Sequence, residues 1–358
     1  MIKSKIILML TLLLPFLINA QEQKKEPGGL FPIRQNRKYG YIDRKGTLII
    51  KPKFDSADNF SEGLAAVKIC DRINASTNTG PRIVVITPEG TNTGEFCDGK
   101  YGYIDRSGNF AVQAHFDSAR SFSEGLAPVS DGIHWGYINR NGRIIVKPQY
   151  DDTWGFSEGL ARVEIDGKWG YIDRTGKMVI NPQFDLADGF SEGIAPVMIE
   201  DKSGYIDKTG RIVIKPQFDN AAEFSEGMGR IAIKDKWGYV DPTGQVIIAP
   251  KYEWAGRFSE GLAVVKINGM RGYINRKGDV AIAADFTGAE EFSEGMAIIM
   301  LNGKYGFIDK TGRIVIKPQF DEALPFCEGL AWVRIGGMAD GKKGYIDKTG
   351  TYIWNPTN

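Results

Sequence analysis

A glutamate recurs along this chain in one fixed setting, Phe-Ser-Glu-Gly or Phe-Cys-Glu-Gly. Two carboxylates that flank a glycosidic bond can hydrolyse it, so such residues are candidates for glycan chemistry. An active site, however, needs side chains that occur once, and this glutamate occurs eight times in the same repeated setting. We therefore interpret the glutamates as structural parts of repeated turns and predict no catalytic residue; they are Glu62, Glu124, Glu158, Glu192, Glu226, Glu260, Glu294 and Glu328.

Other reactive side chains are few. The two histidines, His115 and His134, have no Cys or second His at ligand spacing beside them, so the sequence predicts no zinc site. No Asp-rich calcium loop or phosphate-binding glycine loop is present, and we expect no cofactor. A Ser-His-Asp arrangement stays open.

The elements that must position these residues are repeated units. A Gly followed by an aromatic residue recurs, and from Gly102 to Gly306 the interval is always 136 − 102 = 34 residues. The glycines are Gly40, Gly102, Gly136, Gly170, Gly204, Gly238, Gly272, Gly306 and Gly344. A fixed period of this size indicates an array of stacked supersecondary units rather than one globular core.

One copy, residues 159–192, shows the expected local structure. Alternating apolar residues from Gly159 predict a strand, and Asp166-Gly167 is a preferred pair for a two-residue hairpin turn. A second strand over 168–172 leads into Asp173-Arg174-Thr175-Gly176, which is typical of a type I turn. A third strand over 177–180 completes a three-stranded antiparallel meander. The remaining residues form a connector, whose Phe184 and Phe190 we expect to wedge between successive sheets.

Proline positions agree with a meander whose second strand is central. Pro128 and Pro196 lie in first strands and Pro182 ends a third strand, whereas second strands contain none; proline belongs on edges because it cannot donate a ladder hydrogen bond. The array begins at a first strand near Gly29 and ends at a third strand near Pro356, so no strand is left to complete a shared blade. We therefore predict an all-β open superhelix of nine meanders, with a closed propeller-like ring as the alternative.

The repeated Trp-Gly-Tyr core identifies a resemblance. Trp135-Gly136, Trp169-Gly170 and Trp237-Gly238, each followed by Tyr and then Ile or Val, are similar to the bacterial WG beta-repeat family. The similarity covers residues 29–358. Several copies depart from the pattern, with Ser203, Arg271 or Lys343 in place of the aromatic residue. The resemblance implies an interaction module in the cell envelope or outside the cell, and it names no ligand.

The first residues differ in character from the repeats. Lys3 and Lys5 precede an apolar run over 6–18 that is shorter than the ~20 residues of a membrane span, and Ala20 ends it. We predict a signal peptide over 1–20 and a short linker over 21–28, hence an exported protein that is periplasmic, on the cell surface or secreted. The formal net charge of +1 gives no basic excess for nucleic acid, and no later apolar run predicts a transmembrane segment.

One repeat carries an insertion. Gly40 and Gly102 are 62 residues apart, so this copy holds 62 − 34 = 28 extra residues, with Cys70 and Cys97 at its two ends. In an oxidising compartment we predict a Cys70–Cys97 disulfide that closes a lengthened hairpin over 70–97. Insertions in repeat arrays often carry binding, but a neutral decorated loop is an equal alternative.

Tryptophans are the remaining candidates for a binding surface. Trp135, Trp169 and Trp237 could form a ladder that stacks sugars or peptides, or they could pack on neighbouring Gly and Pro residues. Trp154, Trp254 and Trp332 break the consensus and are better candidates for a specific contact. The sequence therefore predicts a non-catalytic scaffold that binds protein or glycan. The alternatives are a structural cell-envelope or matrix protein and a glycan-active enzyme.

Overall fold

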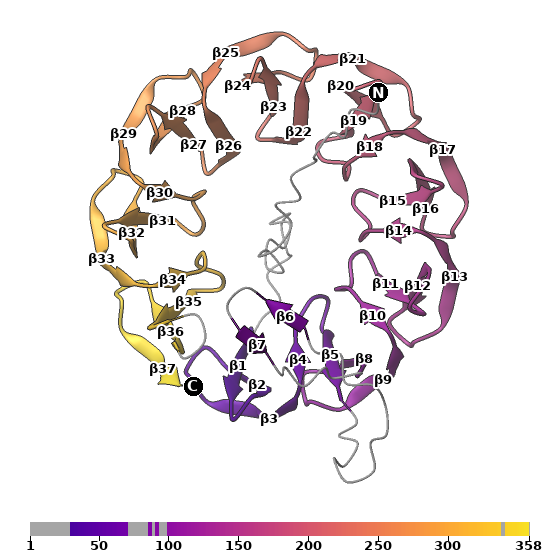
Figure 1. Cartoon of the computed structure of the whole chain (residues 1–358), viewed down its shortest axis with the longest axis vertical. Helices are drawn as coiled ribbons and strands as arrows, with labels where there is room; N and C mark the ends of the chain where they lie inside the picture. The colour runs from indigo at the N-terminus through magenta and orange to yellow at the C-terminus, as the bar shows by residue number, and fades with distance from the viewer. Residues whose placement is uncertain (1–28, 71–84, 88–89, 93–98, 338–340, 358) are drawn as a thin grey trace.

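The computed structural model describes residues 29–70, 85–87, 90–92, 99–337 and 341–357, and these residues form strands and turns without a helix. Nine antiparallel sheets stand around a common axis as the blades of a closed β-propeller (Figure 1). Eight of the described sheets have four strands and blade 1 has three. The predicted open superhelix of three-stranded meanders is therefore wrong: the array is a ring, and its repeating unit is a four-stranded sheet.

Each four-stranded blade runs from the central opening to the rim in chain order (Figure 1). Its short inner strand is β4 (Ser56–Ala57), β10 (Ser118–Ala119), β14 (Asp152–Thr153), β18 (Leu186–Ala187), β22 (Asn220–Ser225), β26 (Trp254–Ser259), β30 (Gly288–Ala289) or β34 (Glu322–Ala323). Its second strand is β5 (Ala65–Ile69), β11 (Leu126–Ser130), β15 (Leu160–Ile165), β19 (Ile194–Ile199), β23 (Met228–Ile233), β27 (Leu262–Ile267), β31 (Met296–Leu301) or β35 (Leu330–Ile335).

The third and outer strands complete blades 2 to 9. The third strands are β8 (Lys100–Ile104), β12 (Trp135–Asn139), β16 (Lys168–Asp173), β20 (Lys202–Asp207), β24 (Lys236–Val240), β28 (Met270–Asn275), β32 (Lys304–Asp309) and β36 (Lys342–Asp347). The outer strands are β9 (Phe110–Phe116), β13 (Ile144–Tyr150), β17 (Met178–Phe184), β21 (Ile212–Phe218), β25 (Val246–Tyr252), β29 (Val280–Phe286), β33 (Ile314–Phe320) and β37 (Tyr352–Thr357). Blade 1 consists of β1 (Phe31–Gln35), β2 (Lys38–Ile42) and β3 (Leu48–Phe54), and β6 (Val85–Thr87) pairs with β7 (Gly90–Asn92) within the insertion.

The inner strand is the element that the connector prediction missed. Residues 184–193 end β17, form β18 and then turn back into β19. Pairing along β18 is limited to Leu186↔Met198 and Ala187↔Val197. A two-residue ladder leaves almost no alternation in the sequence, so hydrophobic periodicity alone cannot reveal it.

The inner strand also corrects the prediction that prolines lie on edge strands. In blades 2 to 9, the first strand of each predicted meander is the second strand of the blade. Pro196 lies in β19, which has a neighbour on each side and is not an edge. The Asp188 amide donates to the Pro196 carbonyl (3.0 Å), while the Asp188 carbonyl accepts the Tyr171 hydroxyl (2.7 Å) of the preceding blade. The tyrosine thus supplies the hydrogen bond that proline cannot donate, and an interior strand tolerates the residue.

The glycine of the Trp-Gly pair is required by close backbone approach. The third and outer strands pair at Trp169↔Phe184 and at Tyr171↔Ile180, so the outer strand bulges across Gly170. A Cβ atom on Gly170 would lie 2.5 Å from the Ile180 carbonyl oxygen and 2.7 Å from the Pro182 nitrogen. Any larger residue would push the outer strand away from the blade.

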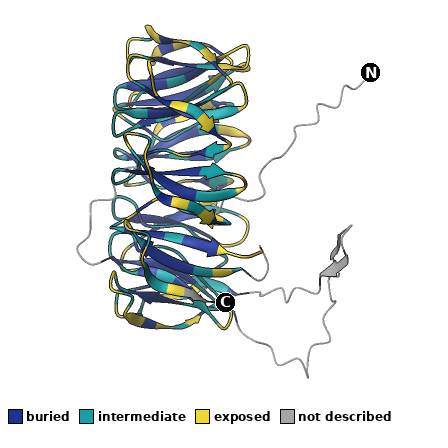
Figure 2. Ribbon diagram, turned by 90° about the vertical axis from the view of Figure 1, so that its left-hand side faces the viewer, coloured by how far each residue is buried: buried dark blue, intermediate teal, exposed yellow. Residues whose placement is uncertain are grey.

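Buried residues are frequent along the strands (Figure 2), and the apolar clusters join residues of adjacent blades, so the core lies between blades. In one cluster, Leu160, Tyr171, Ile180 and Phe184 of blade 4 pack against Phe190, Ala195, Val197 and Ile206 of blade 5. The rings of Tyr171 and Phe190 are 4.9 Å apart, and both side chains are fully buried. Phe184 and Phe190 therefore lie between successive sheets, as expected for wedges.

The ring closes between blade 9 and blade 1 without sharing a strand. Tyr345 of β36 contacts Phe31 of β1, with ring centroids 5.4 Å apart, and its hydroxyl donates to the Pro32 carbonyl (2.9 Å). Phe31 stands where the other blades have alanine or glycine: Ala65, Ala127, Ala161, Ala195, Gly229, Ala263, Ala297 and Ala331. Its ring compensates for the connector phenylalanine, because Glu26 stands at the wedge position of this copy.

Charged and apolar contacts reinforce this seam, which we define as the interface between blades 9 and 1. Arg44 forms an ion pair with Glu328, and the Glu328 carboxylate lies against Gly29. Phe31, Ile33 and Ile42 of blade 1 cluster with Leu330 and Tyr345 of blade 9. The ends of the repeat array therefore meet through specialised side chains, which explains why the lack of a spare strand did not prevent closure.

Candidate functional site

The repeated glutamates hold adjacent blades together. Each lies in a Ser-Glu-Gly or Cys-Glu-Gly turn with a left-handed φ, for example 55° at Glu192. Seven of the eight carboxylates accept the amide of the Gly one repeat later, and the eighth, Glu328, pairs with Arg44 at the seam. The distance from the Glu192 carboxylate to the Gly227 nitrogen is 2.9 Å. The same bond joins Glu62 to Gly125, Glu124 to Gly159, Glu158 to Gly193, Glu226 to Gly261, Glu260 to Gly295 and Glu294 to Gly329.

Two further repeated side chains bridge the blades. The Ser191 hydroxyl donates to the Phe224 carbonyl of the next blade (2.9 Å), and equivalent serines do so around the ring. The Tyr239 hydroxyl likewise donates to the Gly256 carbonyl (2.7 Å). Consensus polar residues are therefore used in assembly, and any specific site must be sought among the residues that differ between copies.

The six candidate tryptophans are divided among several blades. Trp135, Trp169 and Trp237 are half-buried on the third strands β12, β16 and β24. Trp254 is half-buried in β26 and Trp332 in β35, whereas Trp154, directly after β14, is 44% exposed.

Three of these tryptophans belong to one column with two arginines. The Arg120 guanidinium lies 4.3 Å from the ring centroids of both Trp135 and Trp154. The Arg162 guanidinium lies 4.9 Å from Trp154 and 5.5 Å from Trp169. Ring faces in this column are occupied by cations of the protein itself, so the arrangement favours a cation–π column over a bare stacking ladder for sugars.

Ion pairs continue from this column around the central opening. Arg120 pairs with Asp152 of the next blade (3.0 Å), and Arg162 pairs with Asp188 of the blade after that (2.5 Å). The side chains of Arg120 and Arg162 are 28% and 17% exposed. Sequence analysis did not single out these residues.

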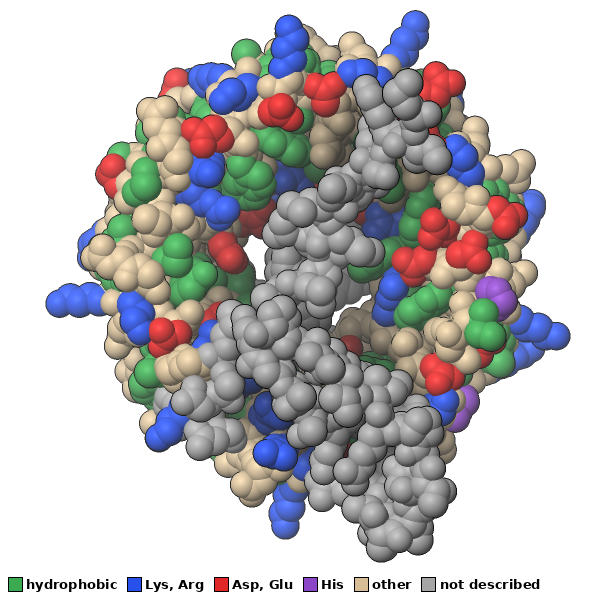
Figure 3. All heavy atoms as spheres, viewed as in Figure 1, with side chains coloured by type: hydrophobic (Ala, Val, Ile, Leu, Met, Phe, Trp, Pro, Cys, Tyr) green, Lys and Arg blue, Asp and Glu red, His purple; other side chains and the backbone are tan. Residues whose placement is uncertain are grey.

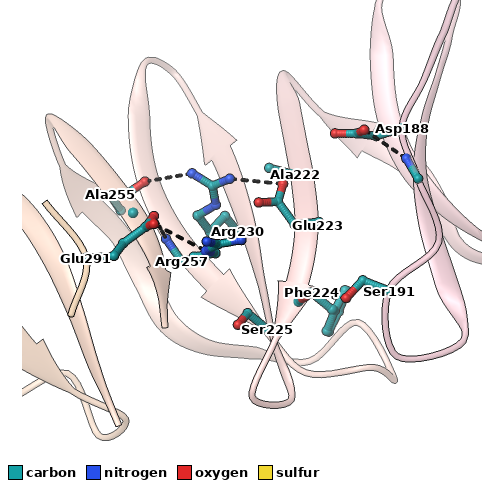
Figure 4. A network of polar contacts seen from close by, with 12 residues as sticks. Asp188, Ser191, Ala222, Glu223, Phe224, Ser225, Arg230, Ala255, Arg257 and Glu291 are labelled. Atoms are coloured by element: carbon teal, nitrogen blue, oxygen red, sulfur yellow. Dashed lines mark hydrogen bonds and ion pairs between the residues drawn. The ribbon is translucent and has the colours of Figure 1, made fainter. Parts of the chain in front are cut away.

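A second group of ion pairs lies on the adjoining arc, in the blades that follow Asp188 (Figure 4). Arg230 pairs with Glu223 of its own blade (3.1 Å) and donates to the Ala255 carbonyl of the next (3.3 Å). Arg257 of β26 pairs with Glu291 of the following blade (3.2 Å). These charged residues, like those of the first arc, come from inner strands or contact them.

We call this set of residues the inner wall because the inner strands border the central opening (Figure 1), which is hollow in the space-filling view (Figure 3). Its members differ from copy to copy; they are Arg120, Asp152, Trp154, Arg162, Asp188, Glu223, Arg230, Arg257, Glu290 and Glu291. The signal in the sequence was their departure from consensus at fixed repeat positions. Arg162 and Arg230, for example, stand where Pro128 and Pro196 stand in other blades.

Two carboxyl groups that directly follow an inner strand have a raised pKa. Burial raises the pKa of Asp58 to about 6. Burial also raises the pKa of Glu290, and the charge of Glu291 adds to this effect, while Arg271 opposes it. Asp58 belongs to blade 2 and Glu290 to blade 8, with blades 9 and 1 between them. The two groups are thus not a catalytic pair.

The other candidates yield no assembled site. Among the described residues, no group of three or more His, Cys, Asp or Glu side chains could hold a metal ion. His115 lies on the ring of Phe116 and its Nδ1 contacts the Gln113 carbonyl (2.8 Å), far along the chain from His134. Cys97 lies outside the described residues, so the Cys70–Cys97 disulfide stays a prediction, as does any binding role of the insertion.

The repeat family can be named from comparison with known sequences. Eight segments match the family described as WG containing repeat, namely 39–69, 101–132, 135–169, 169–202, 204–237, 237–270, 272–305 and 305–338. The chain belongs to this family. The ninth copy of this WG-repeat protein, around Gly344, lies outside the matches and has Lys343 in place of Trp. Among curated proteins, none is similar enough to count as a match.

Solved structures support the fold of this WG-repeat protein. A crystal structure of the eukaryotic initiation factor is similar with a TM-score of 0.61 and 12% identity, over 93% of this chain and 96% of that one. Hsv2 of Kluyveromyces lactis overlaps with a TM-score of 0.38 and 8% identity, over 69% of this chain and 91% of that one. That TM-score is too low to assign a fold. At such identities the likeness shows a propeller fold alone. Within the described chain, no helix is long and apolar enough to cross a membrane.

Proposed function

We propose that this WG-repeat protein is an exported, non-catalytic scaffold that binds a protein or glycan partner through its inner wall. The observation that carries the proposal is the division of labour between repeated and unrepeated residues. Glu, Ser and Tyr of the consensus are engaged in bonds between blades, whereas Arg, Trp and acidic departures gather at the central opening. Binding sites of propellers need such local variation on a regular frame.

The inner wall has the chemistry of a polar recognition surface. The side chains of Arg120 and Arg162 stay 28% and 17% exposed in spite of their ion pairs. Trp154 offers a partly exposed aromatic edge beside the Arg162 guanidinium. Arginine and tryptophan are the side chains most enriched among residues that dominate binding energy. The partner is therefore expected to contribute hydrogen-bond acceptors near the Arg120–Arg162 arc.

A mainly architectural role in the envelope is the second candidate. The Arg120–Asp152, Arg162–Asp188 and Arg257–Glu291 pairs each join two blades, so they can also serve to stiffen the ring. A glycan-active enzyme is less well supported. Hydrolysis needs two carboxyl groups about 5–9.5 Å apart, yet Asp58 and Glu290 lie in separated blades and Glu291 is engaged by Arg257.

A comparison of matched variants tests the binding proposal. The first variant carries Arg120→Gln and Arg162→Gln in the inner wall, and the control carries Arg174→Gln and Arg143→Gln in exposed turns. Partners are identified by pull-down from the cell envelope and by glycan array, and each variant is first checked for an unchanged β-sheet spectrum. We expect the inner-wall variant to lose about tenfold or more in affinity, because each charged hydrogen bond is worth ~1.5–3 kcal/mol.

The outcomes separate the candidates. Equal binding by both variants would reject the inner wall, and a folded protein that retains no partner in either assay would favour the architectural role. A third variant that lacks residues 71–96 assigns binding to the insertion if it alone loses the partner. Cell fractionation and N-terminal sequencing test export, for which we expect a mature chain that begins at Gln21.

A further inference from the structure

One blade offers an unpaired inner edge. In blades 2 to 9 the second strand is covered by an inner strand, but β1 is paired only with β2 among the described residues. In those eight blades, the carbonyl of the residue equivalent to Arg34 accepts the backbone N–H of the residue that directly precedes the inner strand. The accepting residues are Lys68, Ser130, Glu164, Met198, Ala232, Lys266, Met300 and Arg334, at 2.8–3.1 Å. Arg34 has the same register against its neighbouring strand as these residues, but its carbonyl accepts no such N–H within the described chain.

The seam shows how this edge is partly capped. In other blades, the inner-strand amide donates to the carbonyl at the position of Pro32, as Leu324 does to Trp332 (2.9 Å). In blade 1 the Tyr345 hydroxyl takes that position on Pro32, whereas tyrosines such as Tyr273 donate to the inner strand itself. The tyrosine can return to an inner-strand carbonyl if a strand is added, so strand addition costs no hydrogen bond at Pro32.

One cationic side chain, Arg34, lies on this edge, and Lys343 of blade 9 lies near it. Arg34 lies in the position that faces the first residue of each inner strand, and its Nε–H is buried without an acceptor among the described residues. Burial lowers the pKa of the neighbouring Lys343, and the charge of Arg34 lowers it further. In blade 9 the equivalent arginine, Arg334, is opposite Glu322 in the ladder and pairs with it (2.9 Å).

We propose that the inner edge of β1 binds an extended acidic peptide segment of a partner protein, which adds as the fourth strand of blade 1. This proposal deepens the proposed binding function, since it rests on the partner being a protein. The added strand runs antiparallel to β1 and places a carboxylate opposite Arg34, as Glu322 is placed opposite Arg334. Its backbone N–H donates to the Arg34 carbonyl. Main-chain bonds supply affinity and the carboxylate supplies selectivity.

The test uses a peptide copied from the chain's own inner strand in blade 9. The capped peptide Gln-Phe-Asp-Glu-Ala-Leu-Pro, equivalent to residues 319–325, is titrated into the full chain and followed by fluorescence anisotropy of a terminal label. We expect the peptide to bind, and the same peptide with Glu322→Lys to bind about tenfold more weakly. Arg34→Glu in the protein should reverse this preference, while Arg143→Glu in an exposed turn should leave it unchanged.

Hydrogen exchange locates the binding. Slowed exchange of the Arg34 amide on addition of the peptide supports strand addition. Equal affinity for both peptides, an unaltered preference in the Arg34→Glu variant, or slowed exchange only elsewhere would each overturn the proposal. If the peptide binds only after residues 21–28 are removed, the occupant of the edge is that segment of the chain and not a partner protein, and the proposal is rejected. None of these results depends on Arg120 or Arg162, so failure here leaves the inner-wall proposal to its own test.

Discussion

The repeated turn glutamate has a structural role, which explains why it occurs in so many copies and is not a catalytic residue. Glu192 adopts a left-handed backbone conformation that Asn or Gly adopts more easily. The retained side chain is explained by its bond to the Gly227 amide in the next blade. The strain of each turn is thus offset by a contact that only a stacked neighbour can provide. Repetition of the residue follows from repetition of the interface.

Asp58 and Asp188 occupy the same repeat position and differ in their partners. Asp188 pairs with Arg162, whereas Asp58 has no ion-pair partner among the described residues and burial raises its pKa to about 6. A carboxyl group whose pKa is raised by folding binds more protons in the folded state. Its contribution to stability is therefore favourable at low pH and is lost as the pH rises from about 4, the usual unfolded pKa, to about 6.

We predict that Asp58→Asn increases the free energy of unfolding at pH 7 by up to about 3 kcal/mol and has little effect at pH 4. The physical reason is that asparagine removes the desolvated charge without changing the shape of the side chain. Denaturant unfolding of wild type and variant at pH 4, 5, 6 and 7 measures the difference. Asp188→Asn is the matched control, and it should destabilise at pH 7 because it leaves Arg162 without its anion. A pH-independent effect of Asp58→Asn would contradict the assignment.

At the scale of the element, one blade was largely predictable. Asp166-Gly167 has φ values of 51° and 72°, as a two-residue hairpin of the expected type requires. The Asp173 carboxylate accepts the Thr175 and Lys177 amides and fixes the next turn (2.9 and 3.1 Å). These turns depend on residues close in sequence, so local rules were sufficient. The inner strand was missed because its pairing is short and its main contacts are with another blade.

The wedge phenylalanines support a prediction about one interface. Phe190→Ala should lower the free energy of unfolding by about 3–5 kcal/mol, since the side chain is fully buried between two blades and leaves a cavity. Thermal and denaturant unfolding measure the loss. Leu186→Ala in the inner strand of the same blade is the control, because Leu186 is 56% exposed and should change stability little. Similar melting of both variants would disprove the wedge.

For the whole molecule, closure depends on the seam. Every other interface joins consecutive copies, whereas the seam joins residues far apart in the sequence, such as Arg44 and Glu328 at a separation of 284 and Tyr345 and Pro32 at 313. Closing such a long loop has an entropic cost that grows slowly with length. Phe31, Tyr345 and the Arg44–Glu328 pair offset this cost by burying apolar area and linking the two ends.

Phe31→Ala restores the residue found in most other copies, yet we predict that it destabilises the ring. The substitution removes the wedge of the seam, so we expect a loss of about 3–5 kcal/mol and earlier opening on heating. Small-angle scattering near the transition should detect an increased radius of gyration before β structure is lost. The control is Phe190→Ala, which removes a wedge away from the seam and should melt without prior opening there. Ala161→Phe is unsuitable as a control because the larger side chain would overpack an interface.

The sequence by itself determined the period, the turns, the apolar wedges and the family, since each depends on residues a few positions apart or on plain repetition. Only the tertiary structure decided that the array is a ring, because closure depends on the small angle added between successive blades and on contacts between the two ends. The substitution of Phe31 for alanine was visible in the sequence, but its meaning required Tyr345 to be placed beside it. The inner wall followed for the same reason: unrepeated charges scattered along the chain become one surface when nine inner edges point to a common axis.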